Sequence, residues 1–213
     1  MKFLKFITKL SIILFIWLAI GVVSVAFYYL RDIPSIENLQ AKNGKESIEI
    51  NYSNDVKILN LGDLEDNETN FFEFPQHLIN AVLATEDRRF FEHHGVDFVG
   101  VARAAYNNRK AKKIVQGGST ITQQLAKLLF LKPERTFRRK IQEVLLALQL
   151  ERHFTKEQIL TFYLNRAYFG SGAYGIGNAA KHYFGKEPSH LNLNESALLA
   201  GLLKAPTKFS PKN

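Results

Sequence analysis

The sequence has no cysteine among its 213 residues. This absence excludes disulfide bonds, thiol nucleophiles and cysteine-ligated metals, but it does not fix the cellular compartment. Internal repeats and low-complexity tracts are also missing. A chain of this length can bury one sizeable core and carry additional segments outside it.

Acidic residues are missing from the first thirty positions, and charge is uneven beyond them. Residues 31–85 hold 10 acids against 4 bases, whereas residues 86–140 hold 13 bases against 5 acids. Most of the net charge of +8 therefore lies in one block. Nucleic acid, an anionic membrane surface and a phosphorylated substrate would each suit it. No recognition helix or RNA-stacking motif occurs, so nucleic acid is not expected as a partner.

One long hydrophobic run is present, and it lies at the N-terminus. Lys2, Lys5 and Lys9 precede apolar residues from Leu10 to Leu30. As a helix this run rises about 31 Å, close to the hydrocarbon thickness of a bilayer. We predict a cytoplasmic tail over 1–9, a transmembrane helix over 10–30 and the remainder outside. A signal peptide cleaved after Ala26 is the competing interpretation.

The remainder divides into two parts. Residues 31–70 are predicted to be a linker with short extended segments, for example over 47–52. Residues 71–213 are patterned for a mainly α domain. Capping boxes are expected to start three of its helices; they lie at Thr120–Gln123, Thr155–Gln158 and Asn192–Glu195. The last of these helices must end before Pro206.

Glu86 interrupts an apolar pattern. A helix beginning at Pro75 places Leu78, Val82 and Ile79 on one arc. At about 100° per residue Glu86 falls in the middle of that arc and Asp87 at its edge. A carboxylate there needs partners, or a role in proton transfer. The alternative is that the helix ends by Thr85 and Glu86 pairs with a nearby arginine.

Glu143 has a similar setting on a helix predicted over residues 137–151. Ile141, Val144, Leu145 and Leu148 make one apolar face, and Glu143 lies on the other side. Arg139 and Lys140 are within pairing reach at i−4 and i−3. A solvated ionic cluster is one interpretation. A site for phosphate and proton transfer is the other, and two such acids suit a glycosyl-transfer or glycosidase pair.

Three further patterns carry weaker signals. The stretch Gln116–Gln124 is glycine-rich before a capped helix, which suits anion binding without matching a Walker loop. His93 and His94 point about 100° apart on a helix, so they are not expected to share a metal. The cations from Arg103 to Lys113, with Val101 and Tyr106, indicate either an amphipathic membrane-surface segment or a solvated loop.

These motifs, in this order, resemble the family-51 glycosyltransferases, the peptidoglycan glycosyltransferases of bacteria. The motif Glu-Asp-x-x-Phe-x-x-His-x-Gly is matched over 86–95, Gly-x-Ser-Thr-x-x-Gln-Gln over 117–124 and Arg-Lys-x-x-Glu over 139–143. Two longer blocks, 159–186 and 195–206, extend the resemblance. It covers about residues 71–211.

The resemblance implies a mainly α, lysozyme-like glycosyltransferase domain, with a head and a membrane-associated jaw, behind one N-terminal transmembrane helix. It implies polymerisation of lipid II into β-1,4 glycan by inverting transfer, with release of undecaprenyl pyrophosphate. The implied location is the bacterial cytoplasmic (inner) membrane, with the catalytic domain outside. Lipid II, the growing glycan, membrane lipids and other cell-wall synthesis proteins are the implied partners.

By the same resemblance, Glu86 is the general base and Glu143 assists at the pyrophosphate, with Mg²⁺ or Mn²⁺ as an expected cofactor bound at Glu143. The residues implied to bind substrate belong to the three motifs or are basic residues between them. They are Asp87, Phe90, His93, Ser119, Thr120, Gln123, Gln124, Lys127, Arg135, Arg139 and Lys140.

The ending at Asn213 lacks the family's usual closing helix. No Ser-x-x-Lys or Lys-Thr-Gly motif occurs, so this sequence encodes no penicillin-reactive transpeptidase site. We expect either the glycosyltransferase part of a class A penicillin-binding protein or a monofunctional enzyme. A lysozyme-like glycan hydrolase and a non-catalytic lipid II-binding fragment are the alternatives.

Overall fold

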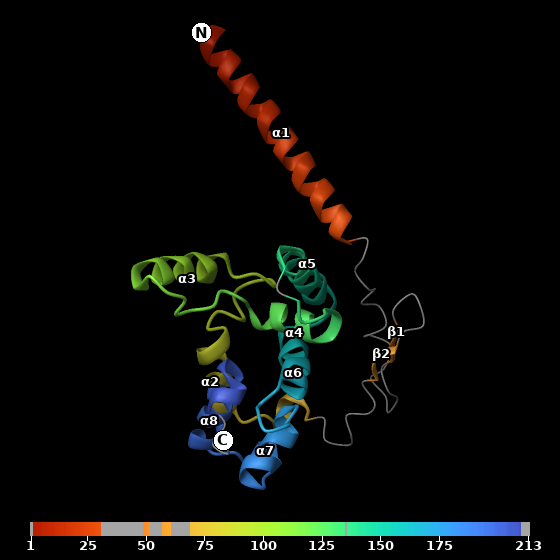
Figure 1. The fold of residues 1–213 in the computed structure, drawn as a ribbon, viewed down its shortest axis with the longest axis vertical. Helices are drawn as coiled ribbons and strands as arrows, with labels where there is room; N and C mark the ends of the chain where they lie inside the picture. Colours follow the sequence, from red (N-terminus) through yellow and green to blue (C-terminus); the bar gives the residue numbers. More distant parts are fainter. Residues whose placement is uncertain (1, 31–48, 52–56, 61–68, 135, 210–213) are drawn as a thin grey trace.

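The computed structural model describes residues 2–30, 49–51, 57–60, 69–134 and 136–209. Helices dominate them, as predicted (Figure 1). The elements in chain order are α1 (Lys2–Leu30), β1 (Glu49–Asn51), β2 (Lys57–Asn60), η2 (Phe71–Glu73), α2 (Gln76–Glu86), α3 (Phe98–Ala111), α4 (Ile121–Phe130), α5 (Phe137–His153), α6 (Lys156–Arg166), α7 (Ile176–Phe184), η3 (Pro188–His190), α8 (Leu193–Lys204) and α9 (Pro206–Phe209).

Helix α1 projects from the rest of the chain (Figure 1). Its described apolar side chains, such as Leu14 and Trp17, are exposed. Within the part of the chain that the structure describes, no helix is both long and apolar enough to cross a membrane. The side chains at 22 and 25–30, which belong to the predicted span, lie outside that part.

Two short strands occur in the segment for which the sequence suggested extended structure. β1 and β2 pair in antiparallel fashion, with Ile50 opposite Leu59. The register shifts between Ile50 and Asn51. Most of the segment 31–68 lies outside the described residues.

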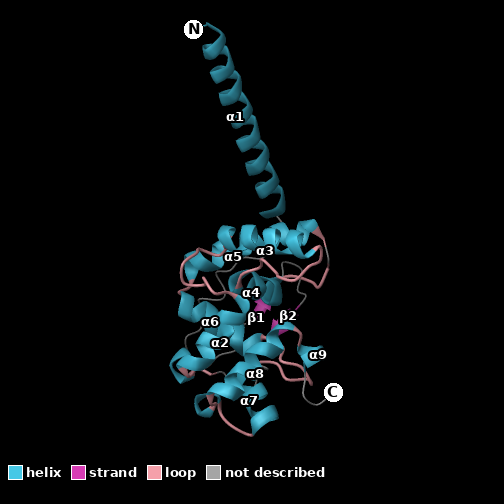
Figure 2. Cartoon of the chain, turned by 90° about the vertical axis from the view of Figure 1, so that its left-hand side faces the viewer, coloured by secondary structure: helices cyan, strands magenta, loops and turns pink. Residues whose placement is uncertain are grey.

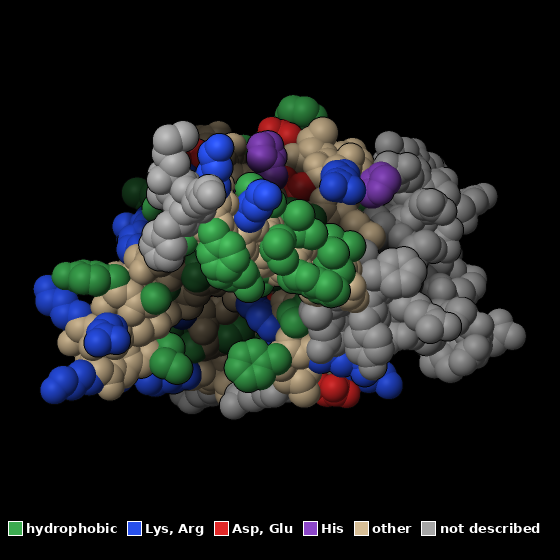
Figure 3. All heavy atoms as spheres, turned by 90° about the horizontal axis from the view of Figure 1, so that it is seen from above, with side chains coloured by type: hydrophobic (Ala, Val, Ile, Leu, Met, Phe, Trp, Pro, Cys, Tyr) green, Lys and Arg blue, Asp and Glu red, His purple; other side chains and the backbone are tan. Residues whose placement is uncertain are grey.

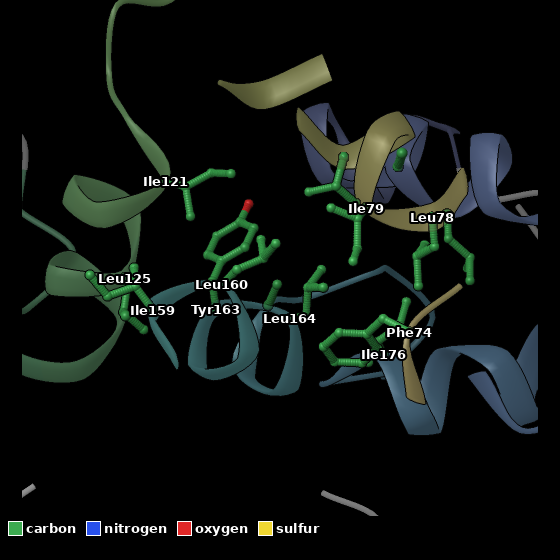
Figure 4. Close-up of a cluster of buried hydrophobic side chains, with 14 of the residues drawn as sticks. Phe74, Leu78, Ile79, Ile121, Leu125, Ile159, Leu160, Tyr163, Leu164 and Ile176 are labelled. Atoms are coloured by element: carbon green, nitrogen blue, oxygen red, sulfur yellow. The ribbon is translucent and has the colours of Figure 1, made fainter. Parts of the chain in front are cut away.

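The core lies where α2 packs on α8 and where α4 packs on both α5 and α6. Leu78 and Val82 of α2, Leu125 of α4 and Leu160 of α6 have no exposed surface. Figure 4 shows part of this core, with Tyr163 among apolar side chains. Helices α3 and α5 lie at the end nearest α1, and α7 lies at the opposite end (Figures 1 and 2).

The three predicted capping boxes are confirmed. Thr120, Thr155 and Asn192 each accept a hydrogen bond from the backbone N–H three residues later. In each case the side chain of that later residue bonds back to the cap. The helix that Asn192 starts ends at Lys204, before Pro206 as expected.

Helix α5 buries the face that carries Glu143, and not the apolar face of Ile141 and Leu148. The buried side chains are Glu143, Leu146, Ala147 and Leu150, whereas the predicted apolar face remains partly or fully exposed. The sequence offers two apolar faces, and hydrophobic periodicity alone does not choose between them. Packing against α4 selects the face that carries the acid.

A glycine-dense turn connects α6 to α7 and packs closely against Asn165. The Asn165 side chain accepts a hydrogen bond from the backbone N–H of Thr69 at 3.2 Å and donates one to its carbonyl at 2.9 Å. Gly175 has φ +81°, and a Cβ there would lie 2.6 Å from the Asn165 carbonyl oxygen. Only glycine fits this approach.

Substitution at this turn tests the packing argument. Gly175→Ala is expected to lower the free energy of unfolding by about 2–4 kcal/mol, because it adds both backbone strain and a clash. Gly172→Ala is the control, since Gly172 has φ +79° but open space around it. It should lose only about 1–2 kcal/mol. Urea denaturation measures both, and equal losses would contradict the packing argument.

Candidate active site

Glu86 is the last residue of α2. Its side chain is partly buried, and its Oε2 accepts a hydrogen bond from Gln124 Nε2 at 2.8 Å. One interpretation of the sequence ended the helix by Thr85 and paired Glu86 with a nearby arginine. The structure instead gives it a neutral amide from α4, which orients the carboxylate without neutralising it.

Tyr163 fixes the orientation of that amide. Its hydroxyl donates to Gln124 Oε1 at 3.1 Å, so the amide nitrogen of Gln124 is the atom directed at Glu86. Burial, with the charge of Glu86 nearby, raises the pKa of Tyr163, which keeps the hydroxyl protonated. The sequence pattern does not indicate this role, because Tyr163 occupies an apolar position of α6. A buried tyrosine hydroxyl, however, usually requires a partner.

Asp87 is more deeply buried than Glu86, the reverse of the predicted order. The helix ends at Glu86, so Asp87 leaves the helical arc on which that order was based. Its carboxylate accepts the backbone N–H of Ile121, the first residue of α4, at 3.0 Å. Its two oxygens also lie 3.1 Å and 3.0 Å from Nε2 of buried His93.

The second acid, Glu143, lies in a cationic cluster on α5. Arg139 donates to Oε1, and Lys140 Nζ donates to Oε2 at 2.9 Å. Lys140 also reaches Ser119 Oγ at 2.8 Å and Gln123 Oε1 at 3.2 Å. The Glu143 side chain is 5% exposed and that of Lys140 is 44% exposed. The cluster is therefore a paired ionic site with one cation open to solvent.

The start of α4 links the two acids. Gln124 bonds to Glu86, and the neighbouring Gln123 bonds to Lys140 of the second cluster. Hydrogen bonds around the first turn of α4 thus connect seven of the residues predicted from the sequence. They are Glu86, Ser119, Gln123, Gln124, Arg139, Lys140 and Glu143. This arrangement connects a proton acceptor and a cationic site to adjacent residues of α4, a combination that suits transfer from a phosphorylated donor.

An open hollow of about 300 Å³ adjoins the cationic cluster. It is lined by the cations Lys127 and Arg139, the acid Glu134, and the apolar residues Leu128, Leu131 and Pro133. Cations beside leucines suit a ligand that joins a phosphate to a hydrocarbon chain. Arg135, the other predicted cation, lies outside the described residues.

Several predicted substrate contacts are buried. Phe90 has no exposed surface, and Asp87, His93, Thr120 and Gln123 are each below 8%. The Thr120 hydroxyl donates to the Gly95 carbonyl at 2.7 Å. Asp87 and Thr120 connect the 87–95 segment to the start of α4. These buried side chains therefore support the site from within the core and are not exposed at its surface.

The residues around Glu143 do not make a metal site by themselves. Both carboxylate oxygens already bond to Arg139 and Lys140. No group of three potential ligands occurs within the described ranges. The expected dependence on Mg²⁺ or Mn²⁺ stays a prediction.

Comparison with known proteins fits this geometry. The sequence profile described as Transglycosylase matches residues 54–213. The chain belongs to the transglycosylase family. This membership confirms the resemblance of its motifs to family-51 glycosyltransferases.

Curated relatives of the family include long proteins. The chain is 58% identical to penicillin-binding protein 1A of Aquifex aeolicus over 139 residues, which are 65% of this chain and 19% of that protein. It is 41% identical to penicillin-binding protein 1A of Escherichia coli over 211 residues, or 99% of this chain and 25% of that protein. The chain thus spans about a quarter or less of these relatives.

Tyr163→Phe tests the buried hydroxyl. At about pH 8 the variant should be about 1 kcal/mol less stable, because Gln124 Oε1 loses a donor. Above the ordinary tyrosine pKa of 10.0, the unfolded hydroxyl ionises while the folded one retains its proton. The free energy of unfolding of the wild type then falls by up to about 1.4 kcal/mol for each further pH unit. The variant has no hydroxyl at this position, so it does not show this decrease.

The stability difference between the two proteins should therefore shrink as the pH rises past 10.0. Urea denaturation at several alkaline pH values measures it. A difference that stays constant would show that Tyr163 is not held in its protonated form.

Proposed function

We propose that this chain is a peptidoglycan glycosyltransferase that polymerises lipid II into β-1,4 glycan. The single observation that carries the proposal is the joining of Glu86 to the Lys140–Glu143 cluster through Gln124 and Gln123. Family membership supports the same activity. The lysozyme-like head, with α3 as part of a jaw, belongs to this proposal.

The two acids of the site have different roles in the reaction. Glu86 accepts the proton of the acceptor sugar's 4-hydroxyl, and that oxygen attacks the anomeric carbon of the donor. The bond from this carbon to the diphosphate breaks, and undecaprenyl pyrophosphate leaves with inversion. Gln124, held by Tyr163, keeps the carboxylate of Glu86 in one orientation.

The cationic cluster serves the leaving group. Arg139 and Lys140, with Lys127 at the adjoining hollow, attract the diphosphate and stabilise the charge that develops on it. Ser119 accepts a hydrogen bond from Lys140 and sets the direction of its ammonium group. Any divalent cation would supply further neutralisation of the diphosphate.

Membrane attachment follows from the substrate. Lipid II is embedded in the bilayer, so the enzyme must reach that surface. We place α1 in the cytoplasmic membrane and the domain on its outer face, because the lysine-flanked run from Leu10 to Leu30 has the length of a span. Other cell-wall synthesis proteins are the partners that such a location favours.

Helix α3 has the composition of a membrane-surface helix. Exposed apolar side chains include Phe98, Val101 and Tyr106, and exposed cations follow toward its end. Figure 3, seen from the α1 end, shows Lys and Arg gathered with apolar side chains at the left, where α3 lies in Figure 1. Such a surface attracts anionic headgroups and buries apolar groups between them.

Polymerisation of labelled lipid II tests the activity. The wild type should produce long glycan and free undecaprenyl pyrophosphate. Glu86→Gln should lower the rate at least about 100-fold, because proton abstraction is lost. Glu143→Gln should lower it about tenfold or more, because the diphosphate site is disturbed.

The matched control is Glu92→Gln, since Glu92 is a 63% exposed carboxylate six residues after Glu86. Its rate should stay close to that of the wild type. Full glycan synthesis by Glu86→Gln would refute the assignment of the base. Clearing of purified sacculi without synthesis would support the hydrolase, and binding of lipid II without either reaction the non-catalytic fragment. Repeating the assay with and without Mg²⁺ tests the cofactor.

Bilayer contact by α3 has its own test. In a Trp17→Phe background, tryptophan placed by Tyr106→Trp should be quenched by brominated lipids in anionic vesicles, because the α3 surface enters the headgroup region. Tyr174→Trp is the control, since Tyr174 is 55% exposed just before α7, at the opposite end (Figure 1). Unquenched fluorescence at position 106 would place α3 away from the bilayer.

A further inference from the structure

A second, largely buried ionic cluster takes no part in the chemistry above. Glu151 Oε1 accepts a hydrogen bond from Thr122 Oγ1 at 2.6 Å and another from Lys156 Nζ at 2.7 Å. The same ammonium group lies 4.4 Å from the centroid of the Phe90 ring. The side chains of Glu151 and Lys156 are 6% and 15% exposed.

These four residues come from four parts of the chain. Thr122 belongs to α4, Glu151 to α5 and Lys156 to the first turn of α6. Phe90 lies on the 87–95 segment, which begins directly after Glu86. The cluster therefore joins α4, α5 and α6 to the segment that directly follows Glu86.

Stability alone does not account for burying charge here. Taking two ions out of water is costly, and apolar side chains of similar volume are often as stable or more so. A buried ion pair does, however, accept only a narrow range of geometries, because each partner must stay within hydrogen-bonding distance. Lys156 must also stay over an aromatic ring.

We propose that Thr122, Glu151 and Lys156 are positioning residues for the glycosyl-transfer step. They fix the rotation of α4 and the place of the 87–95 segment. Gln124 lies two residues after Thr122 on α4, and Asp87 lies three residues before Phe90. A shift of either element therefore changes the direction of the Glu86 carboxylate. This inference rests on the proposed function.

Such a shift affects the reaction step more than substrate binding. Arg139 and Lys140, which hold the diphosphate, lie on α5 and stay paired with Glu143 of the same helix, although Lys140 also bonds to Gln123 of α4. Displacement of a reacting group by about 1 Å can lower a rate about 100-fold. A positioning role thus predicts a lowered kcat with a nearly unchanged KM.

The test replaces the cluster by apolar side chains of similar volume in the triple variant Thr122→Val, Glu151→Met, Lys156→Met. Thermal unfolding and steady-state polymerisation of lipid II are measured on the full chain. The expected result is a melting temperature close to that of the wild type, with kcat lowered about tenfold or more and KM within about twofold. A folded triple variant with wild-type kcat would overturn the proposal.

A single variant keeps the proposal testable if the triple variant does not fold. Thr122→Val retains the volume and the ion pair but removes the hydroxyl that ties α4 to Glu151. It should fold and lose about threefold or more in kcat, and an unchanged kcat would also overturn the proposal.

The control is the exposed pair of Lys181 and Glu187, which are 3.2 Å apart and 42% and 56% exposed. Removing it with Lys181→Met and Glu187→Gln should leave kcat unchanged. An inactive wild type would count against the proposed function itself. An active wild type with equally active cluster variants would count only against the positioning role.

Discussion

The arrangement of the site depends on one buried carboxylate, Asp87. It accepts the first backbone N–H of α4 and bonds to His93. An anion at a helix N-terminus is stabilised by unpaired N–H groups and by the helix dipole. Because Asp87 directly follows Glu86, this contact fixes where α2 ends relative to where α4 begins. The hydrogen bond between Gln124 and Glu86 is a consequence of that fixed distance.

Local rules were sufficient for much of the architecture. Each capping box at Thr120, Thr155 and Asn192 is a pattern of four residues, and its hydrogen bonds form within those residues. The motif acids were identified from the sequence because a carboxylate among apolar positions breaks a period. Their partners required longer-range information. Gln124 was expected to bind substrate, and the sequence did not reveal that its amide nitrogen bonds to Glu86.

What the sequence did not reveal comes from contacts between distant segments. On α5, packing against α4 decides which of two apolar faces is buried, and the acid follows that choice. Tyr163 reaches Gln124 across 39 positions and Glu151 reaches Thr122 across 29. Neither separation leaves a periodic signal. Glu151 also lies at the end of its helix, where a charged residue normally faces solvent.

The central claim is that a proton acceptor at Glu86 and a diphosphate site at Arg139 and Lys140 belong to one reaction centre. A crystal structure with a non-transferable lipid II analogue, bound as both donor and acceptor, tests it most directly. The account predicts the diphosphate oxygens within hydrogen-bonding distance of Lys140 and the acceptor 4-hydroxyl within the same distance of Glu86. A diphosphate bound away from α5, or an acceptor hydroxyl facing another side chain, would contradict it.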